Sequence, residues 1–321
     1  IEPDYETWKE YAYKKGVHAS VMTYLAARKK DFYKIENAAD GKHFVTARGW
    51  DDLSEMIKLY EENGLAVDEQ LICQYLQDAR ISKDFAIYYD LFNKYRSDYQ
   101  VEKILDGTVS ESIVLRAERA SMDERLSLLG LIFDSVTAQL RMVCERENIL
   151  DLVTGQLKTL KEKLKDVSGA AALLSEMIEA EREKLERGKQ SSSISPQTQR
   201  ETRFMLEYLE EFRAAVMQSG TAQKDEFSIV RESFAQKVAE LKGLAADGGR
   251  ALENVFSFCE KAFADGDEIL IFVTELTANY YSARFIGRYG CDRYYMHNKQ
   301  LQFDQRQQEI IKRMDEIQWT V

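Results

Sequence analysis

Proline is nearly absent from this chain, which contains only Pro3 and Pro196 among its 321 residues. Because proline interrupts helix interiors and punctuates loops, its scarcity favours long, uninterrupted helices. Histidine is also scarce, and the three histidines lack the spacing of metal ligands. The four cysteines lie far apart without a CxxC pair, as expected for small buried residues in a reducing compartment. We therefore predict no metal site and a cytoplasmic location.

Long apolar runs and common catalytic motifs are missing as well. No run of about 18 apolar residues occurs, and the first residues do not have the composition of a signal peptide, so we predict no membrane span. The net charge is -11, whereas a dedicated nucleic-acid-binding protein usually has a basic excess. GxxxxGK[ST], GxSxG and HExxH motifs are all absent. The printed sequence therefore contains no complete active site that these motifs would reveal.

Helix-forming residues and apolar residues at helical spacing fill what remains, and they predict an all-α fold. We expect three parts. Residues 1–105 form a small helical bundle, and residues 106–249 form a long antiparallel coiled-coil hairpin. Residues 250–321 form a C-terminal helical segment that packs at the base of the hairpin.

The hairpin is predicted from a heptad pattern. Apolar residues alternate in steps of four and three at Val153, Leu157, Leu160, Leu164, Val167, Ala171, Leu174 and Ile178, and again at Leu185, with Glu181 as the polar position. The same pattern resumes between Met205 and Val216. Between these stretches, residues 188–198 are rich in serine and end in Ser195-Pro196, a favourable helix start, which places the tip there. An unbroken first arm would be about 100 Å long.

Near the end of the chain, tyrosines alternate with arginines. The cluster comprises Tyr280, Tyr281, Arg284, Phe285, Arg288, Tyr289, Arg293, Tyr294 and Tyr295. One interpretation is a nucleic-acid contact made by charge and stacking. The other is a helix interface in which guanidinium groups rest on aromatic rings, and the acidic composition of the chain favours it.

The segment Phe44–Trp50 (FVTARGW) follows a polar loop at 36–42 and begins a predicted helix at Thr46. Arg48 falls in the first turn, where the helix dipole disfavours a cation. This placement indicates an anionic ligand, and the forked, permanently charged guanidinium suits a phosphate. The alternative is a side chain that simply faces solvent.

Several linked motifs of residues 4–62 resemble the small helical lid of MoxR-type AAA+ ATPases. They are WKEYA at 8–12, GVH at 16–18, VMTYL at 21–25, and FVTARGW at 44–50 with Leu53 and Ser54 after it. The resemblance implies that Arg48 is sensor 2, the catalytic arginine that reaches the nucleotide phosphates, and that Arg48 and Thr46 lie at the nucleotide. Ala47 departs from the pattern, because proline is common at that position.

The resemblance also implies what this chain must work with. The Walker A, Walker B and sensor 1 elements of the family precede the lid, so we expect an AAA+ core upstream of Ile1 and no activity from these residues alone. The intact protein would bind ATP and Mg²⁺, form a homo-oligomeric ring, and remodel or chaperone a partner, which in this family often contains a von Willebrand factor A domain. The alternative is a free-standing α-helical scaffold or adaptor without nucleotide chemistry.

Overall fold

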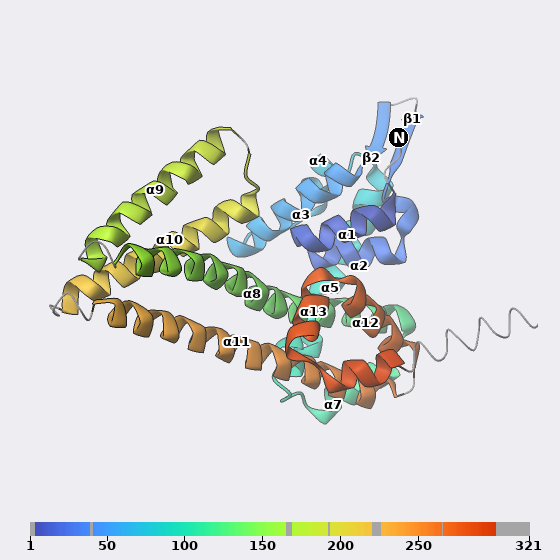
Figure 1. Cartoon of the computed structure of the whole chain (residues 1–321). Helices are drawn as coiled ribbons and strands as arrows, with labels where there is room; N and C mark the ends of the chain where they lie inside the picture. Colours follow the sequence, from blue (N-terminus) through green and yellow to red (C-terminus); the bar gives the residue numbers. More distant parts are fainter. Residues whose placement is uncertain are drawn as a thin grey trace, which may run out of the picture. The chain divides into compact units, whose positions relative to one another are not determined.

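The computed structural model describes residues 4–38, 41–164, 169–191, 193–219, 226–264 and 266–299. It is 85% helical, with fourteen helices of defined bounds and a single two-stranded sheet in the described residues. This confirms the predicted all-α class. The chain divides into two compact units, one formed by Ile1–Gln139 with Gly249–Val321 and the other by Leu140–Gly248 (Figure 1).

The N-terminal part of the first unit is a helical bundle with a β-hairpin inserted in it. Its elements are α1 (Tyr5–Lys15), α2 (Ala19–Ala27), the 3-10 helix η1 (Lys29–Asp31), β1 (Lys34–Ala38), β2 (Gly41–Val45), α3 (Ala47–Glu62), α4 (Glu69–Tyr75) and α5 (Ala79–Tyr99). The strands pair antiparallel, with Lys34 opposite Val45 and Ala38 opposite Gly41. The polar stretch expected as a loop at 36–42 therefore belongs largely to two paired strands.

Aromatic side chains form the core of this bundle. Tyr24, Trp50 and Phe85 are each at most 1% exposed, and their ring centroids lie 5.2–5.6 Å apart. Aromatic pairs at this separation stabilise a core beyond the area they bury. Because the three rings come from α2, α3 and α5, they fix the helix that carries Arg48 to the rest of the bundle.

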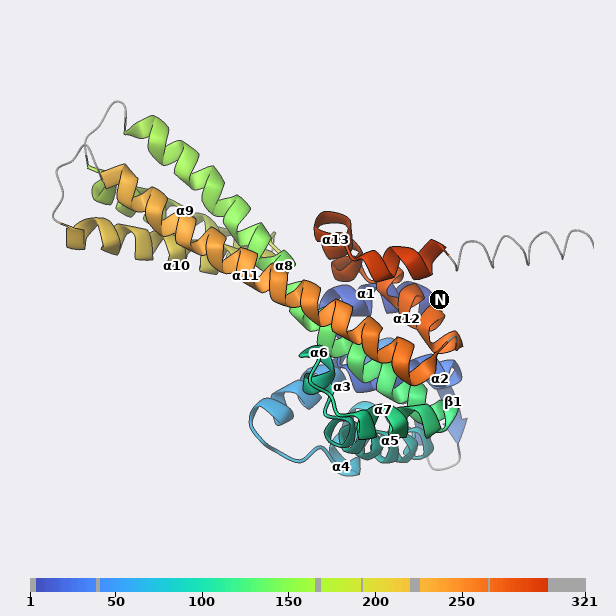
Figure 2. The same cartoon turned by 90° about the horizontal axis from the view of Figure 1, so that it is seen from below.

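The remainder of the first unit is built from α6 (Val101–Leu105), α7 (Glu111–Arg119), the first part of α8 (Met122–Lys163), the last part of α11 (Glu226–Phe263), α12 (Asp267–Ala278) and α13 (Tyr280–Tyr289). Residues 292–299 are also helical. Lys9 of α1 pairs with Glu275 of α12 at 2.6 Å, which joins the beginning of the chain to its last third. Figure 2 shows α12 and α13 beside α1 within this unit.

The second unit contains the rest of α8 and α11 together with α9 (Ala170–Gln190) and α10 (Pro196–Ser219). α8 ends at Lys163, and Gly169, with φ at +107°, precedes α9. The first arm is therefore not one unbroken helix, and the length of about 100 Å is not reached. α9 and α10 pack against each other, and the turn between them lies within residues 188–198, the stretch predicted as the tip.

The seam residues Val153, Leu160, Leu174, Ile178 and Leu185 are buried. Val167 lies outside the described residues.

One described helix has the length and composition of a membrane span. Over an 18-residue window α8 is apolar enough to cross a bilayer, but 56% of that window is buried inside the structure. Core helices of soluble proteins have the same character, so length and composition here are weak evidence for a span.

Candidate functional site

Arg48 projects from the first turn of α3. Its side chain is 89% exposed, and among the described residues its one ion pair is with Asp52, at 3.4 Å between Nε and Oδ2. An exposed pair one helical turn apart is worth about 0.3–0.5 kcal/mol, so it does not hold the guanidinium firmly. Arg48 is therefore available to a ligand that approaches the start of α3.

The neighbours of Arg48 in the FVTARGW segment each have a role within the fold. Phe44 exchanges two backbone hydrogen bonds of 3.0 Å with Gln77, which anchors the base of the hairpin. The Thr46 hydroxyl accepts from the Gly49 amide at 3.1 Å and caps α3. Thr46, predicted to lie at the nucleotide, thus has a capping role here, and its ligand contact remains a prediction.

Gly49 and Trp50 determine how closely α3 packs against neighbouring elements. A Cβ atom added at Gly49 would lie 2.6 Å from the Tyr75 carbonyl oxygen, so only glycine lets α3 approach the end of α4 this closely. Trp50 is fully buried. In the 44–50 segment, Arg48 is the one residue that is exposed to solvent.

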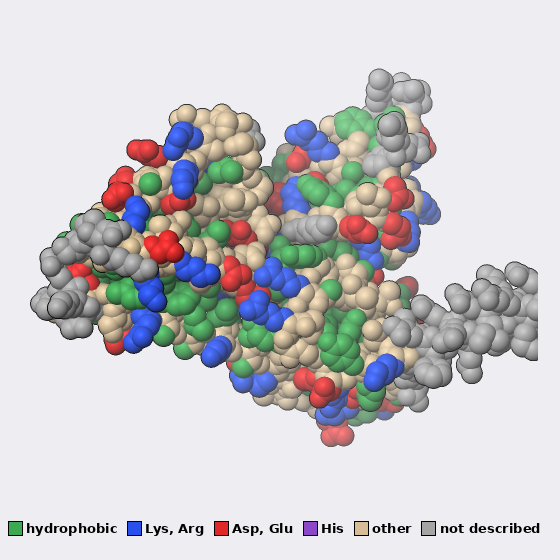
Figure 3. Space-filling model, in the orientation of Figure 1, with side chains coloured by type: hydrophobic (Ala, Val, Ile, Leu, Met, Phe, Trp, Pro, Cys, Tyr) green, Lys and Arg blue, Asp and Glu red, His purple; other side chains and the backbone are tan. Residues whose placement is uncertain are grey.

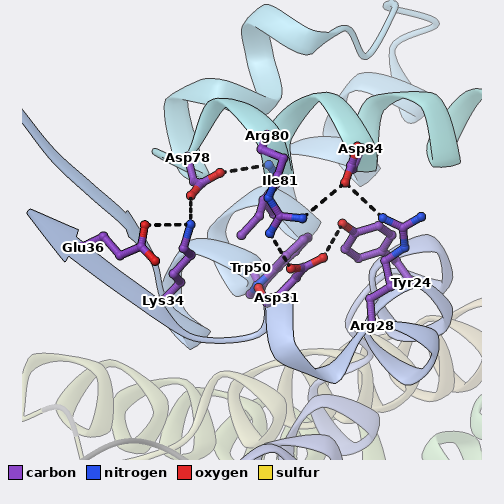
Figure 4. A network of polar contacts seen from close by, with 10 residues as sticks. All are labelled: Tyr24, Arg28, Asp31, Lys34, Glu36, Trp50, Asp78, Arg80, Ile81 and Asp84. Carbon is purple, nitrogen blue, oxygen red and sulfur yellow. Dashed lines mark hydrogen bonds and ion pairs between the residues drawn. The ribbon is translucent and has the colours of Figure 1, made fainter. Parts of the chain in front are cut away.

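A buried aspartate lies beneath this segment (Figure 4). Asp31 is 1% exposed, and its carboxylate accepts from Arg80 and from the Tyr24 hydroxyl, each at 3.0 Å. The Asp31 carbonyl accepts from the Trp50 indole at 3.3 Å. Burial raises the pKa of Tyr24, so its hydroxyl stays protonated and can donate to Asp31. Asp31 thus connects α2, α3 and α5 through three hydrogen bonds.

Two further groups of ion pairs extend this network (Figure 4). Lys34 of β1 pairs with Asp78 at 2.8 Å and with Glu36 at 3.0 Å, and Arg28 pairs with Asp84 at 3.0 Å. Burial alone would raise the pKa of Asp78, but the hydrogen bonds from Lys34 and from the Ile81 amide, together with the positive charges of Lys34 and Arg80, outweigh it and lower that pKa. The network joins the hairpin base to the first turns of α5.

The sequence predicted Arg48 as a site residue, which stays a prediction, and gave no sign of the polar network around Asp31. Asp31 and Arg80 are 49 positions apart, and neither lies in a motif. A lone aspartate in a short 3-10 helix carries no signal that it will be buried, so only the folded structure brings this pair together.

The tyrosine and arginine cluster of the last third divides between core and surface. Tyr281, Phe285 and Tyr294 are buried, whereas Tyr280 and Tyr295 are exposed. Figure 3 shows one face of the molecule with side chains coloured by type. Arg293 pairs with Glu253 at 3.2 Å and also with Glu260. Buried rings and a neutralised arginine favour the helix-interface interpretation over a nucleic-acid contact.

The cysteines and histidines do not form a second candidate centre. Burial raises the pKa of Cys291 to about 12, so its thiol is not a nucleophile at neutral pH. Within the part of the chain that the structure describes, no three His, Cys, Asp or Glu side chains are grouped so that they could hold a metal ion.

Comparison of the chain with protein-family models, with curated proteins and with solved structures gives no match.

Proposed function

We propose that residues 1–105 act as the lid of a MoxR-type AAA+ ATPase, in which Arg48 contacts the phosphates of ATP held by a nucleotide-binding core outside the printed sequence. The observation that carries the proposal is the contrast within the 44–50 segment. Its backbone and side chains anchor, cap and pack α3, while Arg48 is 89% exposed with one weak intramolecular partner. A helix start that is fixed by its neighbours and displays one exposed, weakly paired guanidinium is suited to binding an anion.

The chemistry follows from the guanidinium itself. Negative charge spreads over the transferred phosphoryl group during hydrolysis, and a fixed arginine stabilises it. Mg²⁺ and the remaining groups would come from the core. By the same resemblance, the intact protein would assemble as a ring and act on a partner protein, with a von Willebrand factor A domain protein as one candidate.

The test is ATP hydrolysis by the natural full-length protein with Arg48→Ala. We expect turnover to fall by about 10²–10³-fold, the usual cost of losing one donor to developing charge. Arg48→Lys should restore part of it, because the charge remains without the forked geometry. Arg119→Ala, which removes another exposed arginine, is the matched control and should leave turnover unchanged.

Thermal unfolding separates this role from a structural one. Arg48 has only a surface pair to lose, so the melting temperature of Arg48→Ala should match that of the wild type. Full hydrolysis by the Arg48→Ala protein would refute the assignment. If the natural protein binds and hydrolyses no ATP at all, the alternative of a helical scaffold or adaptor takes its place.

A further inference from the structure

The outward face of α5 carries a stripe of residues separated alternately by four and three positions. Its members are Arg80, Asp84, Ile87, Leu91, Lys94 and Asp98. A spacing that averages 3.5 residues aligns side chains along one line of a helix, as in helices that pair with another helix. The centre of the stripe is apolar, and Ile87 and Leu91 are 52% and 39% exposed.

The order of charges along this stripe is self-complementary in one orientation. Consider two copies of α5 that run antiparallel about a twofold axis midway between positions 87 and 91. Ile87 of each copy then faces Leu91 of the other, and Asp84 faces Lys94. The outermost pair is Arg80 with Asp98. Each of these pairs joins opposite charges. In a parallel arrangement each charged residue would instead face the same residue of the other copy, so like charges would meet.

We propose that the α5 stripe is a contact between two copies of this chain, formed by antiparallel pairing of α5 with α5. A twofold contact must match its own surface, and both the apolar centre and the charge order meet that requirement. Lys94 is exposed and has no ion pair among the described residues, so it is available to the Asp84 of a second copy. The pairing concerns this helix face alone and does not depend on ATP hydrolysis.

Intramolecular ion pairs set how much each charge contributes. Asp84 is already paired with Arg28 and Arg80, Arg80 also with the buried Asp31, and Asp98 with Arg116 of α7 at 2.8 Å. α7 therefore lies beside the C-terminal end of α5 (Figure 2). The outer Arg80–Asp98 pair adds little, and the apolar centre with the two Asp84–Lys94 pairs provides the specificity.

The contact should be weak. α5 has 21 residues, about 30 Å of helix, and offers two aliphatic side chains per copy. Such an interface falls below about 1,200 Å², in the range of transient associations, and we expect a Kd on the order of 100 µM. Asp90 flanks the stripe next to the twofold axis, so two like charges approach each other there and weaken the pair further.

Sedimentation equilibrium of the printed chain over a range of concentrations around that Kd tests the proposal. We expect a monomer–dimer equilibrium that Leu91→Glu weakens by more than tenfold. Leu65→Glu replaces another exposed leucine of the same unit, outside α5, and should leave the Kd unchanged. Asp90→Asn should tighten the dimer several-fold, because it removes the repulsion at the axis.

A charge exchange tests the register. Lys94→Glu and Asp84→Lys should each weaken self-association, because each places like charges together. An equimolar mixture of the two variants should dimerise as tightly as the wild type, since the two exchanged charges then face each other and the unchanged pair is retained. Recovery in the mixture would also show that both variants fold.

A cysteine pair gives a readout independent of mass. A mixture of Ile87→Cys and Leu91→Cys chains should form an intermolecular disulfide in higher yield than either variant alone. A wild type that stays monomeric up to several times the expected Kd, a dimer insensitive to Leu91→Glu, or a charge-exchanged mixture no tighter than its components would overturn the proposal.

Discussion

Replacing Gly49 by alanine should destabilise the first unit even though alanine is the better helix former. The added methyl group would lie 2.6 Å from the carbonyl oxygen of Tyr75. That oxygen belongs to the backbone at the end of α4 and cannot rotate away as a side chain could, so α3 and α4 must separate. Overpacking of this kind costs about 1–3 kcal/mol.

The opposing term is the helix preference of alanine. Alanine in a helix interior gains up to about 0.5–1 kcal/mol over glycine. We therefore expect a net loss of about 0.5–2 kcal/mol in the free energy of unfolding. Gly287→Ala is the matched control, because Gly287 lies in α13 of the same unit and a Cβ there meets nothing within 4 Å. That change should be neutral or stabilising.

Urea unfolding followed by tryptophan fluorescence measures both variants. Of the three tryptophans of the chain, Trp8 and Trp50 are buried in the bundle that contains α3, so its unfolding changes their signal. If Gly49→Ala proved as stable as Gly287→Ala, the close approach of α3 to Tyr75 would be wrong. A loss in both variants would instead mean that helix interiors in this protein tolerate no added methyl, which would contradict the packing argument.

Two further changes probe a buried acid, Asp31, and a half-buried acid, Asp134, of the first unit. Asp31→Asn should cost about 1–3 kcal/mol in urea unfolding, because it weakens the hydrogen bonds from Arg80 and Tyr24 to a buried carboxylate; an unchanged midpoint would show that the network in Figure 4 does not stabilise the fold. Asp134→Asn should act in the opposite direction at neutral pH. Burial raises the pKa of Asp134, so the folded state holds the proton more tightly than the unfolded state and loses stability as the pH rises through the folded pKa. The variant should therefore unfold at a higher urea concentration than the wild type at pH 7, and this difference should shrink as the pH falls toward about 4. A constant difference across that pH range would contradict burial of the Asp134 carboxyl as the cause.

Local sequence patterns account for much of what was predicted correctly. The scarcity of proline and the 3.6-residue periodicity depend on neighbours within one or two turns, and they predicted the all-α class. A helix was predicted from Thr46 onward with Arg48 in its first turn, and in the structure Thr46 caps α3 and Arg48 stands in that turn. Residues 36–42 were wrongly predicted as a loop because local patterns reach only near neighbours. Antiparallel strand pairing depends on a partner strand as much as on local preference.

Contacts between residues far apart in the sequence decided the rest. The heptad seam reads as continuous across residues 153–185, but α8 ends at Lys163 and α9 begins at Ala170 after Gly169, whose φ is positive, and the apolar spacing did not predict this break. Asp31 becomes a buried acceptor only because Tyr24 and Arg80 converge on it. Composition and periodicity thus determined which segments of this chain are helical. Only the tertiary structure decided that Arg48 and the α5 stripe face solvent. Exposure depends on which distant residues pack against a side chain after folding, and local sequence does not show this.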